Sequence, residues 1–129
     1  MPPEPEPGLA HDLAEAISSG EAAPGSGWVA GISACLAAAL VVKTAVRSKG
    51  WGGAEGARSQ AVELRDRLLA LAGQDTRAYE RALTALERRD TGLARALERA
   101  ADVPLAIAET AADVALLAAE AAGAADGAA

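Results

Sequence analysis

The sequence of 129 residues contains no Phe, one Cys and one His, and its aromatic content is only 2%. A lone cysteine cannot form an intrachain disulfide or a cysteine-based zinc site, and a single histidine excludes most other transition-metal sites. The shortage of aromatic residues argues against a sandwich or barrel, because strands are rich in aromatic and β-branched side chains. We therefore expect neither a metal site nor an all-β fold.

Alanine takes the place of the missing residue types and occupies 36 of the 129 positions. Most of the other apolar residues are Leu and Val, and Ala, Leu, Arg and Glu all favour helix. A chain of this length has room for one compact domain with a modest core. The composition predicts a single all-α domain.

Positive charge is also scarce, and the net charge is −6. Residues 1–23 and 102–129 contain acidic residues and no Lys or Arg, whereas residues 24–54 contain three bases and no acid. The chain has no basic stripe broad enough to follow a phosphate backbone. We expect no nucleic acid among its partners.

The sequence also lacks the pattern of an export signal and of a membrane span. Its first eight residues are acidic and rich in proline, whereas a signal peptide begins with basic residues followed by an apolar run. The longest apolar run, Trp28–Val42, has 15 residues, fewer than the about 20 that cross a bilayer. We expect a cytoplasmic, soluble protein with no membrane partner.

The apolar pattern divides the chain into a disordered tail at 1–8, one helical domain at 9–122 and a frayed tail at 123–129. Within the domain, the apolar spacing and the helix-breaking residues predict five or six helices joined by short connections, an up-and-down bundle. The expected helices cover about residues 9–19, 28–48, 57–72, 76–89, 93–102 and 103–122.

Two of these helices show regular apolar stripes with spacings of four and three residues. The stripes are Ala57, Ala61, Leu64, Leu68 and Leu71 in one helix, and Val103, Ile107, Thr110, Val114, Leu117 and Ala121 in the last helix. We expect Pro104 in the first turn of that last helix, where a missing N–H costs nothing.

The helix expected at 76–89 is less regular. Gly73 separates it from the preceding helix, and Asp75 or Thr76 is its predicted N-cap. Its inner face is predicted to contain Tyr79, Leu83 and Leu86.

The helix expected at 28–48 is apolar on all sides, which is typical of a helix enclosed by other helices or by a partner subunit. A chain of this size has few helices with which to enclose it. We therefore expect a two-fold homodimer with this helix at the interface. A heteromeric protein partner is the alternative.

Several short motifs follow one another in a family-like order. A turn, Pro24 to Trp28, precedes the Ala-rich helix; Asp75, Ala78 and Tyr79 form an Asp-x-x-Ala-Tyr motif; and residues 100–105 read Ala-Ala-Asp-Val-Pro-Leu. From about residue 9 to 123 the chain resembles the cyclodeaminase/cyclohydrolase family. That family includes the cyclodeaminase domain of formiminotransferase-cyclodeaminase and bacterial methenyltetrahydrofolate cyclohydrolases.

The resemblance implies a helical, dimer-forming domain that acts on the one-carbon group of a tetrahydrofolate derivative, as a cyclodeaminase or a cyclohydrolase. The substrate would be a tetrahydrofolate derivative, and no cofactor is bound covalently. The family motifs carry over as catalytic residues onto Asp75 and Tyr79, and as substrate-binding residues onto Pro24, Gly25, Ser26, Gly27, Trp28, Lys43 and Arg47.

Simpler structural roles remain open for the same residues. The segment Pro24–Gly27 also suits a connecting turn, and Asp75 also suits a helix cap. Tyr79 also suits a core position with its hydroxyl at the rim. Lys43 and Arg47 also complement the negative end of a helix dipole.

The sequence departs from the family at several positions, which leaves a second function open. The turn Ser of the family is Trp28, and the Met and Asn at the end of its Ala-rich helix are Lys43 and Val46. The alternative is a non-catalytic helical accessory or assembly subunit derived from that family, and a generic Ala-rich bundle is a third interpretation. A cavity beside Gly25 favours the enzyme, whereas Trp28 filling that space favours the accessory subunit.

Overall fold

The computed structural model describes residues 7–128, so most of the tail expected at 1–8 lies outside the described residues. The described chain consists of four helices joined by short connections and contains no strand. The helices are α1 (Pro7–Ser18), α2 (Ser26–Arg47), α3 (Ala54–Arg88) and α4 (Leu93–Ala128).

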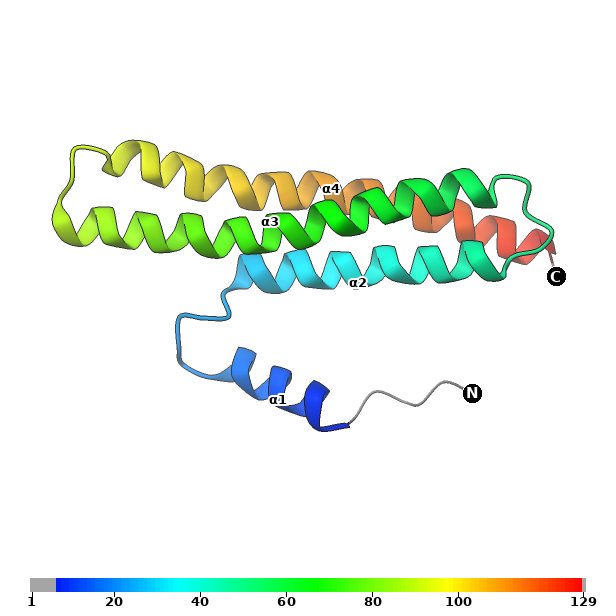
Figure 1. Ribbon diagram of the computed structural model, residues 1–129, viewed down its shortest axis with the longest axis horizontal. Helices are drawn as coiled ribbons and strands as arrows, with labels where there is room; N and C mark the ends of the chain where they lie inside the picture. The colour runs from blue at the N-terminus through cyan, green and yellow to red at the C-terminus, as the bar shows by residue number, and fades with distance from the viewer. Residues whose placement is uncertain (1–6, 129) are drawn as a thin grey trace.

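Three long helices make up the body of the fold. Figure 1 shows α2, α3 and α4 side by side in an up-and-down arrangement, with α1 set apart beside the first half of α2. The end of α3 and the start of α4 extend beyond the start of α2 as a two-helix hairpin. The predicted all-α class and up-and-down bundle are confirmed.

The predicted number of five or six helices is wrong for the described residues, because two expected breaks are absent. Helix α3 continues through Gly73, and α4 continues through residues 102–104. An interior glycine costs a helix only about 1 kcal/mol relative to alanine. The buried faces on both sides of Gly73 pack on the other helices and hold α3 as one element. Asp75 and Thr76 therefore lie within a helix and are not N-caps.

Helix α4 also passes through two positions where an end was expected. Pro104 lies in its interior, eleven residues after Leu93, and not in a first turn. Beyond residue 122, where a frayed tail was expected, the helix continues to Ala128. The consequence of Pro104 is local: the carbonyl oxygen of Ala100 lacks the N–H that would normally bond to it.

The two predicted stripes form the core. Leu68 and Ala61 are fully buried, and Ile107, Val114, Leu117 and Ala121 are nearly so. They pack against Cys35, Ala38 and Val41 of α2 in two clusters along the bundle. The free Cys35 behaves as a small buried apolar residue, and burial raises the pKa of its thiol.

The inner face predicted for residues 76–89 is wrong. Tyr79 is 50% exposed, and Leu83 and Leu86 are also exposed. The buried positions of this part of α3 are instead Ala78, Ala82 and Ala85. Small side chains allow α3 and α4 to lie close together, which places the larger side chains outside the helix contact.

Helix α2 buries one face and exposes another. Its buried positions are Gly31, Cys35, Ala38, Val41 and Ala45. The exposed face includes Leu36 and Leu40, which are 60% and 63% exposed. By length and composition α2 is able to cross a membrane, a property that core helices of soluble proteins share.

Replacing Leu68 with Ala tests the predicted core. We expect a loss of about 2–5 kcal/mol in the free energy of unfolding, because the change leaves a cavity at a fully buried site. The neighbouring Leu69→Ala is the control: Leu69 is 56% exposed, so its change should stay within about 0.5 kcal/mol. Equal losses in urea denaturation would contradict the assigned core.

Candidate functional site

A cavity of about 630 Å³ opens where the start of α2 meets the middle of α3. Its floor and walls come from three helices and the connection before α2. The lining residues are Ala22, Ala23, Gly25, Ser26, Gly27, Ala30, Asp75, Thr76, Tyr79, Glu80, Leu83, Ala100 and Pro104.

The cavity brings together five of the residues that the resemblance singled out. Gly25, Ser26 and Gly27 contribute the start of α2, and Asp75 and Tyr79 contribute one face of α3. These two segments are separated by nearly 50 residues in the sequence. Their meeting is a property of the antiparallel packing of α2 against α3.

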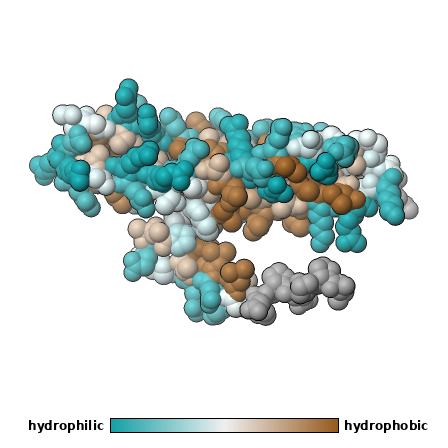
Figure 2. Space-filling model, in the orientation of Figure 1, coloured by the Kyte–Doolittle hydropathy of each residue, from teal (hydrophilic) through white to brown (hydrophobic). Residues whose placement is uncertain are grey.

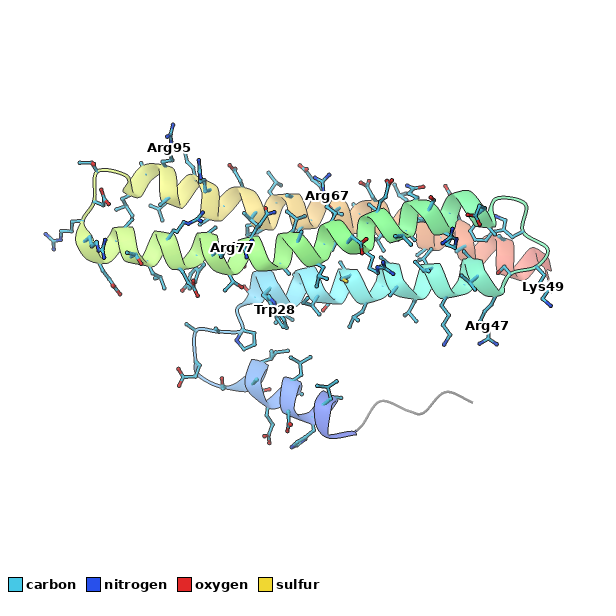
Figure 3. All side chains as sticks on the ribbon, viewed as in Figure 1. Trp28, Arg47, Lys49, Arg67, Arg77 and Arg95 are labelled. Carbon is cyan, nitrogen blue, oxygen red and sulfur yellow. The ribbon has the colours of Figure 1, made fainter. Side chains whose placement is uncertain are left out.

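Four other candidate residues lie elsewhere. Pro24 and Trp28 flank the turn but do not line the cavity, and Figure 3 shows Trp28 at the first turn of α2. Lys43 follows Ser26 by 17 residues of the same helix, a separation of about 25 Å. Arg47 lies one turn further, at the opposite end of α2 (Figure 3). Within one chain, these two bases and the cavity do not form one site.

At Gly27 the backbone of α2 lies against the side chain of Asp75 in α3. A β-carbon on Gly27 would overlap the carboxylate of Asp75. The Asp75 side chain therefore lies directly against the backbone at the start of α2. The absence of a side chain at position 27 is a steric requirement of this arrangement.

Asp75 is the residue of the cavity whose pKa the fold shifts. Its side chain is half-buried in the cavity wall, and this burial raises the pKa of the carboxyl group. Among the described residues, its carboxylate has no ion-pair partner. Such a carboxyl group holds a proton more readily than an exposed Asp does, which suits it to proton transfer with a ligand in the cavity.

The start of α2 supplies hydrogen-bond donors to the same space. The N-cap residue Gly25 has no side chain with which to cap the helix. The N–H groups of the first turn consequently have no partner within the helix, and they carry the positive end of its dipole. The hydroxyl groups of Ser26 and Tyr79 add further polar contacts at the cavity.

Several lining residues were not among the predicted site residues. Thr76, Glu80 and Leu83 follow Asp75 and Tyr79 at helical spacing and share their face of α3. Treating residues 54–88 as one helix would have placed them together. Glu80 adds a second carboxylate, so the cavity is lined by two acidic side chains and no basic one.

The opposite wall comes from α4. Ala100 and Pro104 are one turn apart, and both line the cavity. Because Pro104 has no N–H, the carbonyl oxygen of Ala100 is an additional acceptor in this wall. This acceptor arises because Pro104 lies inside α4, whereas the sequence predicted it in the first turn of a helix.

A second, smaller hollow of about 250 Å³ lies on a different face of α3 and α4. It is lined by Arg81, Arg95 and Arg99 and contains none of the predicted site residues. In the part of the chain that the structure describes, no group of three His, Cys, Asp or Glu side chains is arranged to hold a metal ion. The larger cavity is therefore the candidate site.

Comparison with known proteins gives one match. The sequence model of a family described as formiminotransferase-cyclodeaminase matches residues 10–129. No curated protein and no solved structure matches the chain. The match covers the turn, the three long helices and every residue that lines the cavity.

The contact between Gly27 and Asp75 is testable by coupled substitutions. Gly27→Ala should lower the free energy of unfolding by about 1–3 kcal/mol, because the new methyl group displaces the Asp75 carboxylate. Adding Asp75→Ala should recover most of this loss. At Gly25 a β-carbon would meet only Ala22 O, at 3.6 Å. The loss from Gly25→Ala should therefore be unaffected by Asp75→Ala, and additivity in both pairs would refute the contact.

The raised pKa of Asp75 predicts a pH-dependent effect on stability. The folded state holds this proton more tightly than the unfolded state, so its contribution favours folding at low pH. That contribution is lost as pH rises from about 3.9, the ordinary Asp value, through the raised pKa. Asp75→Asn should therefore stabilise the protein at pH 7 and lose this advantage at pH 3. The exposed Glu87→Gln is the control, and a gain at pH 7 that persists unchanged at pH 3 would refute the assignment.

Proposed function

The chain belongs to the formiminotransferase-cyclodeaminase family, and we propose that its larger cavity binds a tetrahydrofolate derivative and acts on the one-carbon group. The observation that carries the proposal is the open cavity at Gly25–Gly27, with the perturbed carboxyl group of Asp75 in its wall. Trp28 does not line this space. The geometry therefore favours the enzyme over the accessory subunit.

The size and lining of the cavity suit a small bicyclic ligand. A volume of about 630 Å³ lies within the range of small-molecule sites, about 300–1,000 Å³. Leu83, Ala30 and Pro104 offer apolar walls to a flat ring. The carbonyl of Ala100 and the carboxylate of Glu80 accept hydrogen bonds, which matches the amino and N–H groups on the edge of a pterin.

The charge of the cavity suits the charge of the one-carbon group. The methenyl bridge of a folate is a cationic amidinium, and a protonated formimino group is also cationic. Two carboxylates without a neighbouring base, Asp75 and Glu80, stabilise such a cation in a partly desolvated site. The same carboxylates would disfavour an anionic group at this position.

Asp75 is the proposed proton carrier. In a cyclohydrolase, water adds to the methenyl carbon, and a base must remove a proton from that water. In a cyclodeaminase, the anilino nitrogen of the folate attacks the formimino carbon on the pterin ring nitrogen, the carbon–nitrogen bond to the departing ammonia breaks, and the proton of the anilino nitrogen must reach that ammonia. A carboxyl group whose pKa is raised by burial accepts and returns the proton in either reaction.

Tyr79 is the proposed second polar group. Its phenol belongs to the same face of α3 and is half exposed at the cavity. A phenolic hydroxyl both donates and accepts a hydrogen bond, so it can hold the attacking water or the leaving nitrogen. The free N–H groups at the start of α2 hold the polar edge of the ligand.

The proposed location of the protein is the cytoplasm.

Turnover of two folates tests the proposal. Purified protein should convert methenyltetrahydrofolate or formiminotetrahydrofolate, followed by the absorbance of the methenyl group. Asp75→Asn should lower kcat by about 10²–10⁴-fold, because it removes the proton carrier. Tyr79→Phe should lower kcat/KM by about tenfold, the equivalent of one hydrogen bond.

The control is Glu87→Gln, which changes a carboxylate of α3 that does not line the cavity. Its kcat should equal that of the wild type. Tight folate binding without turnover, detected by the fluorescence of the two tryptophans, Trp28 and Trp51, would overturn the catalytic role and support the accessory subunit. Absence of both binding and turnover would overturn the assignment of the cavity.

A further inference from the structure

The smaller hollow is lined by both arms of the hairpin that joins α3 to α4. Its volume is about 250 Å³, and three of its six lining residues are arginines: Arg81 of α3, and Arg95 and Arg99 of α4. The hollow thus has three positive charges and no negative one, although the whole chain has a net charge of −6. The other lining residues have no ionisable side chain; they are Ala78, Gly92 and Ala96.

Helix geometry places the three arginines around one space. Arg95 and Arg99 are four residues apart, so they are neighbours on one face of α4. Ala78 is buried one turn before Arg81 on α3, and the small side chains of Ala78 and Ala96 leave the space between the arginines open. All three arginines are exposed, so a ligand in solution can reach them.

No acidic side chain of the described chain neutralises these arginines. None of the three takes part in an ion pair within residues 7–128. Asp90, the acid of the connecting turn, accepts a hydrogen bond from the N–H of Gly92 at 3.2 Å and does not line the hollow. Like charges four residues apart on a helix repel each other, so Arg95 and Arg99 destabilise α4 slightly. A bound anion would offset this repulsion.

The start of α4 adds positive potential at the same place. Gly92 immediately precedes α4 and lines the hollow. The first turn of α4 contains no acidic residue, so its own side chains do not neutralise the positive end of the helix dipole. Figure 2 shows hydrophilic side chains gathered over the hairpin end of the molecule, and Figure 3 shows Arg95 projecting from α4 there.

We propose that this hollow binds the phosphate group of a small molecule, at a site separate from the larger cavity. A phosphate group has about two negative charges and three acceptor oxygens, which several guanidinium groups match with paired N–H···O bonds. A carboxylate has a single charge and is satisfied by one arginine. The volume is smaller than the about 300–1,000 Å³ of sites for drug-sized ligands. The ligand is therefore inorganic phosphate or a small phosphomonoester.

A phosphate group in this position joins the two arms of the hairpin. Arg81 contacts it from α3, and Arg95 and Arg99 contact it from α4. The hairpin extends beyond the start of α2, so its end is held by the contact between α3 and α4 (Figure 1). An anion bound by both arms stabilises the part of the fold that α2 does not support.

Calorimetric titration of the full chain with inorganic phosphate, at constant ionic strength in chloride, tests the site. The wild type should bind one phosphate per chain. Arg99→Gln should weaken this binding at least about tenfold, because it removes a charge-assisted contact. The matched control is Arg67→Gln, which removes an exposed arginine of α3 that lines neither hollow. No binding by the wild type, or equal weakening by both variants, would overturn the proposal.

Thermal denaturation separates the loss of a site from the loss of the fold. In chloride, Arg99→Gln should unfold no earlier than the wild type, because the change relieves the repulsion from Arg95. Added phosphate should raise the Tm of the wild type and of Arg67→Gln by mass action, and should raise that of Arg99→Gln much less. An equal rise in all three proteins would be an effect of phosphate on the solvent and would contradict a bound anion.

NMR of protein labelled only at glycine nitrogen locates the anion. The amide signal of Gly92 should shift as phosphate is added, whereas those of Gly25 and Gly27 should not. These two glycines mark the start of α2, which also offers N–H groups but lies beside two carboxylates. Shifts at Gly25 and Gly27 in place of Gly92 would assign the anion to the larger cavity and overturn the proposal. No folate is present, so the result is independent of the proposed function.

A series of anions identifies the chemical class of the ligand. Glycerol phosphate and inorganic phosphate should compete for the hollow. Tighter binding of the ester would assign the site to phosphomonoesters, and tighter binding of inorganic phosphate would assign it to the free anion. Acetate at the same ionic strength should not compete. Equal binding of acetate, or tighter binding of an oligoglutamate peptide than of either phosphate, would assign the arginines to carboxylates and refute the proposal.

Discussion

The close contact between Gly31 of α2 and Ala72 of α3 sets the geometry on which the site depends. A β-carbon on Gly31 would lie 3.0 Å from the β-carbon of Ala72, closer than most side chains approach. The helices are antiparallel, so one turn toward the start of α2 leads to Gly27, while one turn forward along α3 leads to Asp75. This contact therefore places the backbone of α2 at Gly27 directly against the carboxylate of Asp75. A larger residue at position 31 would separate the helices and remove Asp75 from the donors of α2.

The cavity is a consequence of building helix contacts from alanine. Ala61, Ala72 and Ala78 occupy the inner face of α3, and their small volume lets the neighbouring helices approach. Tyr79 and Leu83 are then left beside the helix contact and become walls of the cavity. The interior gains close packing, but it buries few large side chains, and hydrophobic stabilisation grows with the apolar area buried. A small core and exposed large apolar side chains, such as Leu83 and Leu86, therefore have the same origin.

Acidic and basic side chains lie in different parts of the molecule. Acidic side chains line the cavity, where they suit a cationic one-carbon group, and the free bases of α2 lie at its far end. Within a single chain, about 25 Å of helix separates the two charge types.

The sequence alone determined the all-α class, the two buried stripes, the family, and the pairing of the turn with Asp75 and Tyr79 as candidates. Local spacing is sufficient for these because a helix repeats its faces at a fixed angle per residue. It could not determine which of two adjacent stripes on α3 faces inward, since Ala82 and Leu83 are equally good helix residues. That choice depends on how closely α4 approaches, which is a property of the packed structure.

The continuity of α3 and α4 was likewise decided only by tertiary structure. An interior glycine costs about 1 kcal/mol and an interior proline about 3 kcal/mol, so Gly73 and Pro104 read locally as helix ends. Helix α3 has buried positions before and after Gly73, whereas α4 has half-buried positions before Pro104 and buried ones after it. Packing of each helix against the other two long helices exceeds the local cost. The same packing turned Asp75 from an expected cap into a cavity wall and brought Glu80 beside it. Sequence patterns set the faces of each helix, and only the contacts between helices decided which faces met.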